Sequence, residues 1–204
     1  MGRKSDAKER LQDAALELIW ERSYGVVTID AICEKAGVKK GSFYYFYESK
    51  ADLAVAALEA DWQANAKPWW DNVFSASVPP MERIRTFLQM THDKQAVMQK
   101  EHGQILGCPC FSIGSEICTQ SEVLRATAQE ILQRQIRYFE TAIRDAQARG
   151  EIGEGDPNAK AKCLYALFEG SLAQARIQND LEFLRTLPSS AMEVLGVRKD
   201  ATVA

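Results

Sequence analysis

The sequence predicts an all-α protein in which a small three-helix domain precedes a larger helical domain. Three observations predict this fold class. Apolar residues recur at spacings of three and four along most of the chain, which places them on one face of a helix. Residues that begin or end helices flank these segments, as Thr28 and Gly37 do for one of them. An alanine-rich stretch, residues 50–66, has high intrinsic helix propensity.

The first predicted helix covers residues 6–23 and follows a polar, basic arm of residues 1–5 that is expected to be mobile. Its apolar stripe consists of Leu11, Ala14, Ala15, Leu18 and Ile19. Such a stripe needs a partner, so this helix is expected to pack across the two helices that follow it. Gly25 ends the segment.

Two short helices joined by a tight turn are predicted within residues 28–47. Thr28 can cap the first helix, because its hydroxyl accepts a backbone N–H of the first turn. Gly37 stops that helix, since glycine adopts the left-handed conformation without a steric penalty. Cys33 is small enough for a second helix to cross nearby, and Phe43 of that helix can point into the core. This is helix-turn-helix geometry.

The outer face of the second helix, roughly residues 39–47, carries cations, a hydroxyl and phenols around a glycine. Its members are Lys39, Lys40, Gly41, Ser42, Tyr44 and Tyr45. A DNA duplex requires such groups, because phosphates take charge and donors while a slim surface fits the major groove. Ser49 then caps a third helix, and Lys50 in its first turn can reach a phosphate. The alternative is a helical bundle with solvated lysines and core aromatics.

One set of residues spans about residues 11–58 in a fixed order and spacing: Tyr24-Gly25, Thr28, Ile32, Ala36-Gly37-Val38, Lys40-Gly41-Ser42-Phe43-Tyr44-Tyr45, Tyr47, Lys50 and Leu53. This pattern resembles the N-terminal domain of the TetR/AcrR family of one-component transcriptional regulators. The resemblance implies a DNA-binding domain in residues 1–52 and a ligand-sensing and dimerisation domain in residues 53–204. Cys33 stands where the family usually has Ala. Phe46-Tyr47 replaces the usual His-Phe and removes a common phosphate donor.

The resemblance further implies a homodimeric repressor that places two recognition helices in successive major grooves of a pseudo-palindromic operator. We assign Lys40, Gly41 and Tyr44 to base edges. The residues assigned to phosphates are Thr28, Lys39, Ser42, Tyr45 and Lys50. A small-molecule or thiol-reactive inducer would tilt the fourth helix, so that the two half-sites are no longer matched together.

Composition agrees with a local DNA-binding face rather than a polycation. The net charge is −3, but residues 1–50 hold nine Lys/Arg and eight Asp/Glu (+1), and the remainder sixteen and twenty (−4). There is no run of about 18 apolar residues that could span a bilayer. We therefore expect no membrane partner, and we expect a cytoplasmic location. Five cysteines, an odd number, indicate thiols rather than a disulfide framework.

A fourth helix is predicted to run from Ser49 to about residue 66, where Pro68 ends or kinks it. Residues 67–80 are expected to form a connector with an aromatic cluster. The aromatic residues Trp62, Trp69, Trp70 and Phe74 can line a ligand cavity, with Phe111, Tyr138, Phe168 and Arg176 as further candidates. Ordinary hydrophobic core is the alternative for Trp62, Trp69, Trp70 and Phe74. A helix of residues 81–100 follows.

Cys108 and Cys110 flank Pro109 in the next segment and permit three interpretations. A metal site is a poor match, because one Cys-Pro-Cys and a loose His lack zinc-finger spacing. Buried structural thiols are the commonest outcome for free cysteine. The third interpretation is a sensor of oxidants or electrophiles, since Cys108 lies near a predicted helix start, where the helix dipole favours thiolate.

Further residues resemble the regulatory domain of the electrophile-responsive, N-ethylmaleimide-repressor branch of the family. They are Gly107-Cys108, Ser115-Glu116-Ile117-Cys118, Ser121-Glu122, Leu164-Tyr165-Ala166-Leu167, Gly170, Gln174-Ala175 and Ile177. In that branch the cysteine at the position of Cys108 is reactive, whereas its helper lysine is replaced here by Arg176, which stays protonated. A thiol-redox protein or enzyme using Cys108 and Cys110 is the alternative function.

Two long helices complete the chain, at residues 121–149 and from Asp156-Pro157 to about residue 177. The second is apolar over more than half its circumference and therefore needs a partner on two sides. Small residues, Gly170 among them, would allow a second copy to approach, and the family resemblance implies a dimer of this kind. We expect no catalytic centre, no metal and no cofactor. The tail from residue 198 is expected to fray.

Overall fold

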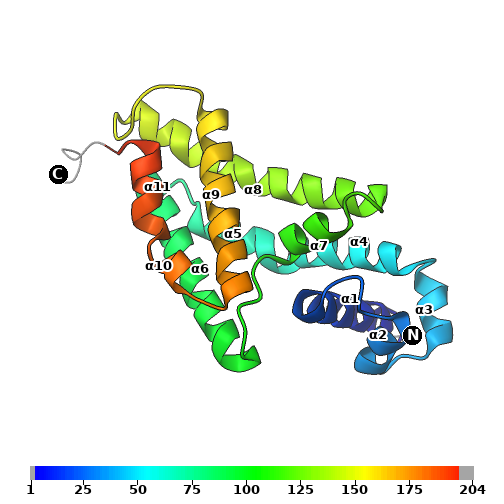
Figure 1. The fold of residues 1–204 in the computed structure, drawn as a ribbon. Coiled ribbons are helices and arrows are strands. Elements are labelled where there is room, and N and C mark those ends of the chain that lie inside the picture. Colours follow the sequence, from blue (N-terminus) through cyan, green and yellow to red (C-terminus); the bar gives the residue numbers. More distant parts are fainter. Residues whose placement is uncertain (1–2, 198–204) are drawn as a thin grey trace. The chain divides into compact units, whose positions relative to one another are not determined.

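The computed structural model describes residues 3–197, and in these the all-α fold predicted from the sequence is confirmed (Figure 1). The helices are α1 (Arg3–Arg22), α2 (Ile29–Ala36), α3 (Lys40–Phe46), α4 (Lys50–Asp61), the π-helical η1 (Trp62–Ala66), α5 (Lys67–Val73), α6 (Pro80–His102), α7 (Pro109–Ile117), α8 (Glu122–Ala148), α9 (Pro157–Gln178), α10 (Glu182–Arg185) and α11 (Leu187–Leu195). An isolated antiparallel bridge joins Ile152 and Val197.

The chain forms two compact units that are not contiguous in sequence. One comprises residues up to Lys67 together with Cys108–Leu132, and the other Pro68–Gly107 together with residues from Gln133 onward. The predicted division at residue 52 differs from this one, because α7 packs against α1 and so joins the first unit. Helix α8 contributes residues to both units.

The first unit is organised around α1, which contacts α2, α3, α4 and α7. Leu11 and Ala15 of its predicted stripe are fully buried. Thr28 caps α2 as expected, since its Oγ1 accepts the Ala31 N–H at 3.1 Å. Gly37 ends α2 with a φ of 61°, so the left-handed stop is also confirmed.

Residues 67–73 of the expected connector form helix α5. The helix that Ser49 caps does not stop near residue 66 but widens into the π-helical turn η1, in which the Lys67 N–H donates to the Trp62 carbonyl five residues earlier. Proline lacks an N–H and collides with the preceding turn of a regular α-helix, and the wider π-helical turn lies directly before Pro68, where the helix departs from α geometry. The helix therefore continues through Pro68.

Two aromatic residues that were not singled out in the sequence occupy the core of the second unit. Phe87 of α6 and Phe139 of α8 are both almost fully buried, and their ring centroids lie 5.1 Å apart in an edge-to-face arrangement. Phe168 of α9 packs on Phe87 at 5.1 Å. Such ring pairs contribute about 0.5–1.5 kcal/mol each beyond the area they bury.

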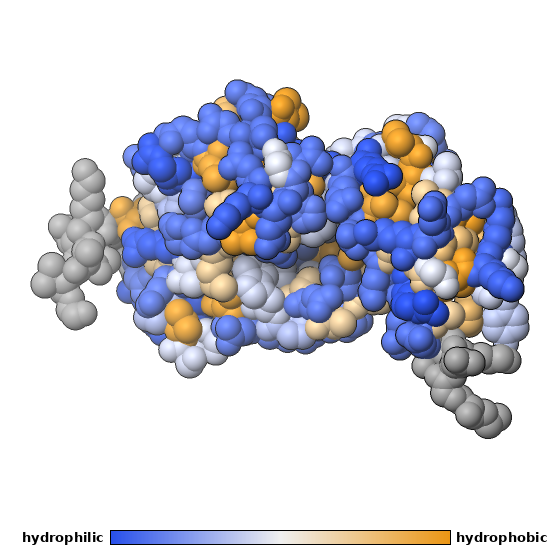
Figure 2. Space-filling view, turned by 90° about the horizontal axis from the view of Figure 1, so that it is seen from below, coloured by the Kyte–Doolittle hydropathy of each residue, from blue (hydrophilic) through white to orange (hydrophobic). Residues whose placement is uncertain are grey.

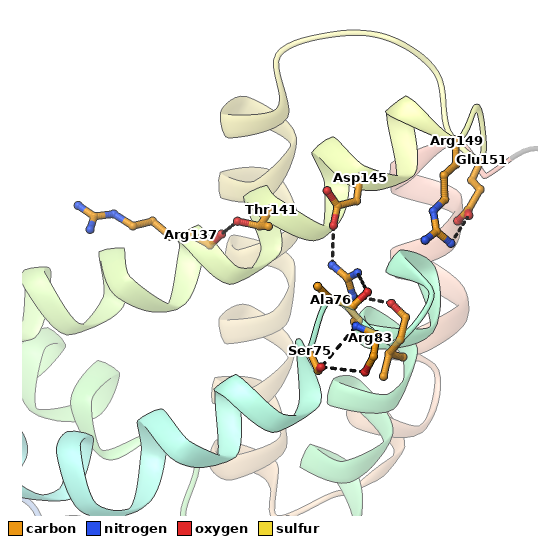
Figure 3. Close-up of polar contacts among 10 residues, drawn as sticks. Ser75, Ala76, Arg83, Arg137, Thr141, Asp145, Arg149 and Glu151 are labelled. Atoms are coloured by element: carbon orange, nitrogen blue, oxygen red, sulfur yellow. Dashed lines mark hydrogen bonds and ion pairs between the residues drawn. The ribbon is translucent and has the colours of Figure 1, made fainter.

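Arg83 is the main buried cation of this core (Figure 3). Its guanidinium donates to Asp145 Oδ2 at 2.6 Å, to the Val78 carbonyl at 2.7 Å and to the Ala76 carbonyl at 3.1 Å. These contacts join the segment before α6 to α8. A buried charge that is paired and hydrogen-bonded in this way can be tolerated in a core.

Other differences from the predicted elements lie near the ends of the chain. Helix α1 begins at Arg3, so the arm expected at residues 1–5 is helical from residue 3. Helix α11, which begins at Leu187 with Pro188 in its first turn, was not predicted; proline is tolerated there because the N–H groups of a first turn have no partner within the helix. Residues 1–2 and the expected frayed tail, 198–204, lie outside the described residues.

Within residues 3–197, no helix combines the length and the apolar character needed to cross a bilayer. The face shown in Figure 2 is mostly hydrophilic, with hydrophobic residues in small separate areas.

Candidate functional site

Helix α3 presents an outward face that is almost entirely exposed. Phe43 is fully buried and Tyr47 nearly so, and these two rings attach α3 to the first unit. The phenols of Tyr44 and Tyr45 point away and are 55% and 66% exposed. Adjacent exposed rings on one helix form a surface that a partner can contact. The backbone thus separates the anchoring residues from the residues assigned to DNA.

Gly41 lies in the first turn of that exposed face. Its φ is not among the positive values of this chain, so the backbone does not require glycine there. A Cβ at this position would meet nothing within 4 Å, so packing within the chain does not require glycine either. The open space above Gly41 is consistent with the close approach of another molecule.

The cations of this face differ in their surroundings. Lys39 is the exposed N-cap residue of α3 and makes no side-chain capping bond. Lys40 forms an ion pair with Asp30 of α2, with 2.7 Å between Nζ and Oδ1. The hydrogen bond to Asp30, together with its charge, raises the pKa of Lys40 above the ordinary value, so Lys40 is charged at neutral pH. Ser42 is half-buried, next to these residues.

Lys50 has a structural role that the sequence did not reveal. Its Nζ donates to the carbonyls of Tyr24 at 2.7 Å and Val27 at 2.8 Å, and lies 4.1 Å from the centroid of the Tyr24 ring. Burial lowers the pKa of Lys50. These contacts tie the first turn of α4 to the turn between α1 and α2. The phosphate contact assigned to Lys50 stays a prediction.

Glu116 of α7 was not identified as a functional residue. Its carboxylate accepts two backbone N–H groups of the same turn, Tyr24 to Oε2 at 2.9 Å and Gly25 to Oε1 at 2.7 Å. More than 90 residues separate the partners in sequence, so spacing could not have revealed the contact. Gly25 was the one available signal, because glycine permits a close approach.

Cys108 begins α7, as predicted. It is the N-cap residue and its Sγ accepts the Phe111 N–H at 3.5 Å, with Pro109 at the first helical position. The Cys108 side chain is half-buried, whereas Cys110 is buried with its Sγ 3.7 Å from the Ala128 carbonyl. In the described part of the chain, no three His, Cys, Asp or Glu residues gather closely enough to hold a metal ion.

The loop that precedes Cys108 is held by two polar side chains of the second unit. The buried Gln95 amide accepts the Gly107 N–H at 3.0 Å and donates to the Gly107 carbonyl at 3.3 Å. Asn179, the left-handed C-cap of α9, accepts the Ile105 N–H at 3.0 Å. Gly107 has a φ of 73°, and its missing Cβ leaves room for Arg176, whose Cδ would lie 3.3 Å away.

The aromatic ligand candidates do not form one set. Trp62 and Phe111 belong to the first unit, the other rings to the second. In the second unit Trp70 packs on Phe74, Tyr138 and Phe87, with centroid distances of 5.3, 5.3 and 4.3 Å. Trp69 is half-buried and contacts Trp70, and Phe168 joins the cluster through Phe87. The rings fill space against one another, which is the core alternative; a ligand role for them stays a prediction.

Two polar contacts in the second unit were not predicted from the sequence. The Tyr138 hydroxyl donates to Asp71 Oδ1 at 2.5 Å, and burial together with this bond raises the pKa of Tyr138. The Tyr165 hydroxyl lies between the side-chain oxygens of Gln135 and Glu169, 2.9 Å from the latter, and all three residues are buried. Periodicity shows which residues are buried but not which polar groups meet there.

Comparison with known proteins gives two family matches. The model for bacterial regulatory proteins of the tetR family matches residues 11–57, and the model for the tetracyclin repressor-like C-terminal domain matches residues 80–188. The transcriptional regulator AcuR of Cereibacter sphaeroides is 31% identical over 173 residues, which cover 84% of this chain and 77% of AcuR. The transcriptional repressor NemR of Escherichia coli K12 is 27% identical over 178 residues, 87% of each chain.

Solved structures agree. A regulatory protein TetR from Rhodobacter sphaeroides superposes with a TM-score of 0.82 at 29% identity, covering 92% of this chain and 98% of its own. Escherichia coli NemR in its reduced form superposes with a TM-score of 0.83 at 25% identity, covering 95% and 99%.

Proposed function

This chain belongs to the TetR family of bacterial regulatory proteins, and on that premise we propose that it represses transcription from a pseudo-palindromic operator and is released by an inducer. The chain is a DNA-binding transcriptional regulator, and regulators of this family bind operator DNA and act as dimers. Its relatives include repressors, whereas nothing supports a thiol-redox protein. The proposal includes the cytoplasmic location, because the protein acts on DNA.

The observation that carries the proposal is the outward face of α3. Phe43 is buried beneath it, while Tyr44, Tyr45 and the Lys40 side chain, which is 53% exposed, face outward around the open space at Gly41. We assign Lys40, Gly41 and Tyr44 to base edges in the major groove, where such donors can distinguish base pairs. The phosphate assignments are Thr28, Lys39, Ser42, Tyr45 and Lys50.

The exposed face of α9 supports a homodimer. Ile177 is 76% exposed, and Ala166 and Gly170 are exposed on the same side of the helix. A Cβ at Gly170 would meet nothing within 4 Å. Because small residues allow two helices to approach closely, we propose that this face packs on a second copy. Gly170→Arg is expected to yield a monomer in size-exclusion chromatography with light scattering; an unchanged dimer would refute this face as the interface.

The inducer that we propose is an electrophile with an activated carbon–carbon double bond. The Cys108 Sγ accepts a backbone N–H at the start of α7, a position that favours thiolate. The thiolate would attack the electron-poor carbon and form a C–S bond; the displaced π electrons would take up a proton at the neighbouring carbon. A relative that has been solved in a reduced form supports thiol chemistry. A reversible ligand beside Trp70 and Tyr138 is the second candidate.

The direct test is selection of duplexes from a random pool by the purified protein. The expected product is a palindromic consensus whose affinity falls linearly with the logarithm of salt concentration, because phosphate contacts release counterions. Selection without any enriched sequence would refute specific DNA recognition.

A further inference from the structure

We propose that Glu116 is a positioning residue for DNA recognition: from α7 it holds the turn between α1 and α2, and thereby the helix-turn-helix, in the geometry that reads DNA. The proposal rests on the proposed DNA-binding function. It is carried by contacts inside the first unit, where α7 and α1 pack together.

The Glu116 contact is bidentate and points at backbone alone. Oε2 accepts the Tyr24 N–H at 2.9 Å and Oε1 the Gly25 N–H at 2.7 Å. A carboxylate with two parallel N–H donors makes short, charge-assisted bonds that fix direction as well as distance. This contact restricts the side chain at Gly25, where a Cβ would lie 2.9 Å from Oε1. Gly25 has no positive φ, so this close approach is what requires glycine.

The opposite side of the same turn is held by Lys50. Its ammonium group donates hydrogen bonds to the carbonyls of Tyr24 and Val27. The carboxylate of Glu116 therefore binds the N–H groups of the turn, and the cation of Lys50 binds its carbonyl groups. Ser23, immediately before, has a φ of 99°, which is rare for a residue with a side chain. A backbone in that region persists where neighbouring contacts enforce it. Glu116 and Lys50 are such contacts.

The turn determines where the helix-turn-helix begins. Thr28, the N-cap of α2, follows Val27 directly, and α3 packs on α2. A shift of the turn therefore moves the start of α2 and, with it, the exposed face of α3. Because recognition needs side chains placed within a fraction of an ångström, loosening this turn lowers affinity without touching a DNA-contacting residue.

Helix α7 lies outside the helix-turn-helix and is positioned by other residues. Gly114 packs on Ala128 of α8, where a Cβ on Gly114 would lie 3.1 Å from the Ala128 Cβ, and Cys108 is the N-cap residue of α7. The half-buried Cys108 Sγ accepts the Phe111 N–H, so a bulky group added to this sulfur would be placed against the first turn of α7 and could displace it. Glu116, two turns further on, would carry that displacement to residues 24 and 25.

The test compares Glu116→Gln with Glu122→Gln. Both variants lose one negative charge on an exposed side chain of the first unit, but Glu122 pairs with Arg125 on its own helix rather than with the turn between α1 and α2. Backbone amide exchange by NMR is expected to be about tenfold faster at Tyr24 and Gly25 in Glu116→Gln, and affinity for the selected duplex about tenfold lower. Glu122→Gln should leave both unchanged.

Gly25→Ala provides a second variant, since its Cβ would push the carboxylate away; it should reproduce both effects while the far-ultraviolet circular dichroism stays that of the wild type. Unchanged amide exchange in Glu116→Gln would overturn the clamp itself. Faster exchange with unchanged affinity would overturn the positioning role. The exchange measurement needs no DNA, so a wild-type protein that selects no duplex would refute the proposed function separately from the clamp.

Discussion

The ammonium group of Lys40 on α3 lies 2.7 Å from the carboxylate of Asp30 on α2, so a residue assigned to a base edge is already paired within the chain. Both side chains are more than half exposed, and pairs of this kind contribute little to stability. The energetic cost is therefore small when Lys40 leaves Asp30 and donates to an acceptor on a base. In the absence of DNA, the pair holds Lys40 over the exposed face of α3.

Lys40→Ala is expected to weaken binding to the selected duplex by about tenfold or more and to relax the preference at one base pair, because a base-edge donor is lost. Lys39→Ala should instead weaken binding to all duplexes alike and reduce the salt slope by about one. Lys35→Ala, which removes a cation paired with Glu17, serves as the control. Fluorescence anisotropy at several salt concentrations measures all three. Equal effects on all sequences in Lys40→Ala would contradict its base assignment.

Gly41→Ala separates recognition from folding. Alanine is the better helix former and nothing crowds its Cβ, so thermal unfolding should show a gain of about 0.5–1 kcal/mol. Affinity for the selected duplex should fall, since the methyl group occupies the space kept open for DNA. Unaltered affinity would remove Gly41 from the interface.

Cys108→Ser should keep DNA binding after treatment with N-ethylmaleimide, whereas the wild type should lose it. The exposed Cys163 and the half-buried Cys118 will also be alkylated, so Cys163→Ser and Cys118→Ser are the matched controls and should lose binding like the wild type. Gel-shift titration with mass-spectrometric mapping of the adducts measures this. Wild-type binding that survives full alkylation of Cys108 would direct the search to a reversible ligand.

Arg83→Ala is expected to destabilise the protein by about 3 kcal/mol, because the carbonyls of Ala76 and Val78 and the Asp145 carboxylate lose the donor that Arg83 provides. Arg144→Ala, which removes an exposed cation paired with Glu140 on α8, should change the unfolding free energy by less than about 1 kcal/mol. Urea denaturation compares the two. A small effect of Arg83→Ala would show that water replaces the guanidinium.

Alkaline unfolding provides a pH test at Tyr138. Burial and the hydrogen bond to Asp71 raise the pKa of Tyr138 in the folded state, so the folded protein holds this proton more tightly than the unfolded chain. The stability it contributes is present below the unfolded value of about 10 and declines as pH rises above it. Tyr138→Phe should therefore lose less stability between about pH 9 and 11 than the wild type. If the unfolding free energies of Tyr138→Phe and the wild type fall in parallel over this pH range, the Tyr138 proton is not linked to stability.

Much of the helical content was predictable, because caps and periodicity are local. Thr28, Gly37 and the Asp156-Pro157 start of α9 each satisfy or terminate a helix through their nearest neighbours. Whether the helix ends or continues at Pro68 was not, since a π-helical turn depends on how the widened backbone packs. The candidate DNA face followed from residue types on one helix, whereas the partners of Lys40 and Lys50 lie on other elements.

The sequence by itself determined most of the helices, the residues that could face DNA and the cysteine at the start of α7, because each depends on residues within a turn or two of one another. Only the tertiary structure decided that Glu116 meets the amides of Tyr24 and Gly25, that Lys50 holds the same turn, and that Phe87 and Phe139 are at the centre of the aromatic core. These contacts join segments far apart in the chain, and the packing that brings them together leaves no local pattern in one sequence.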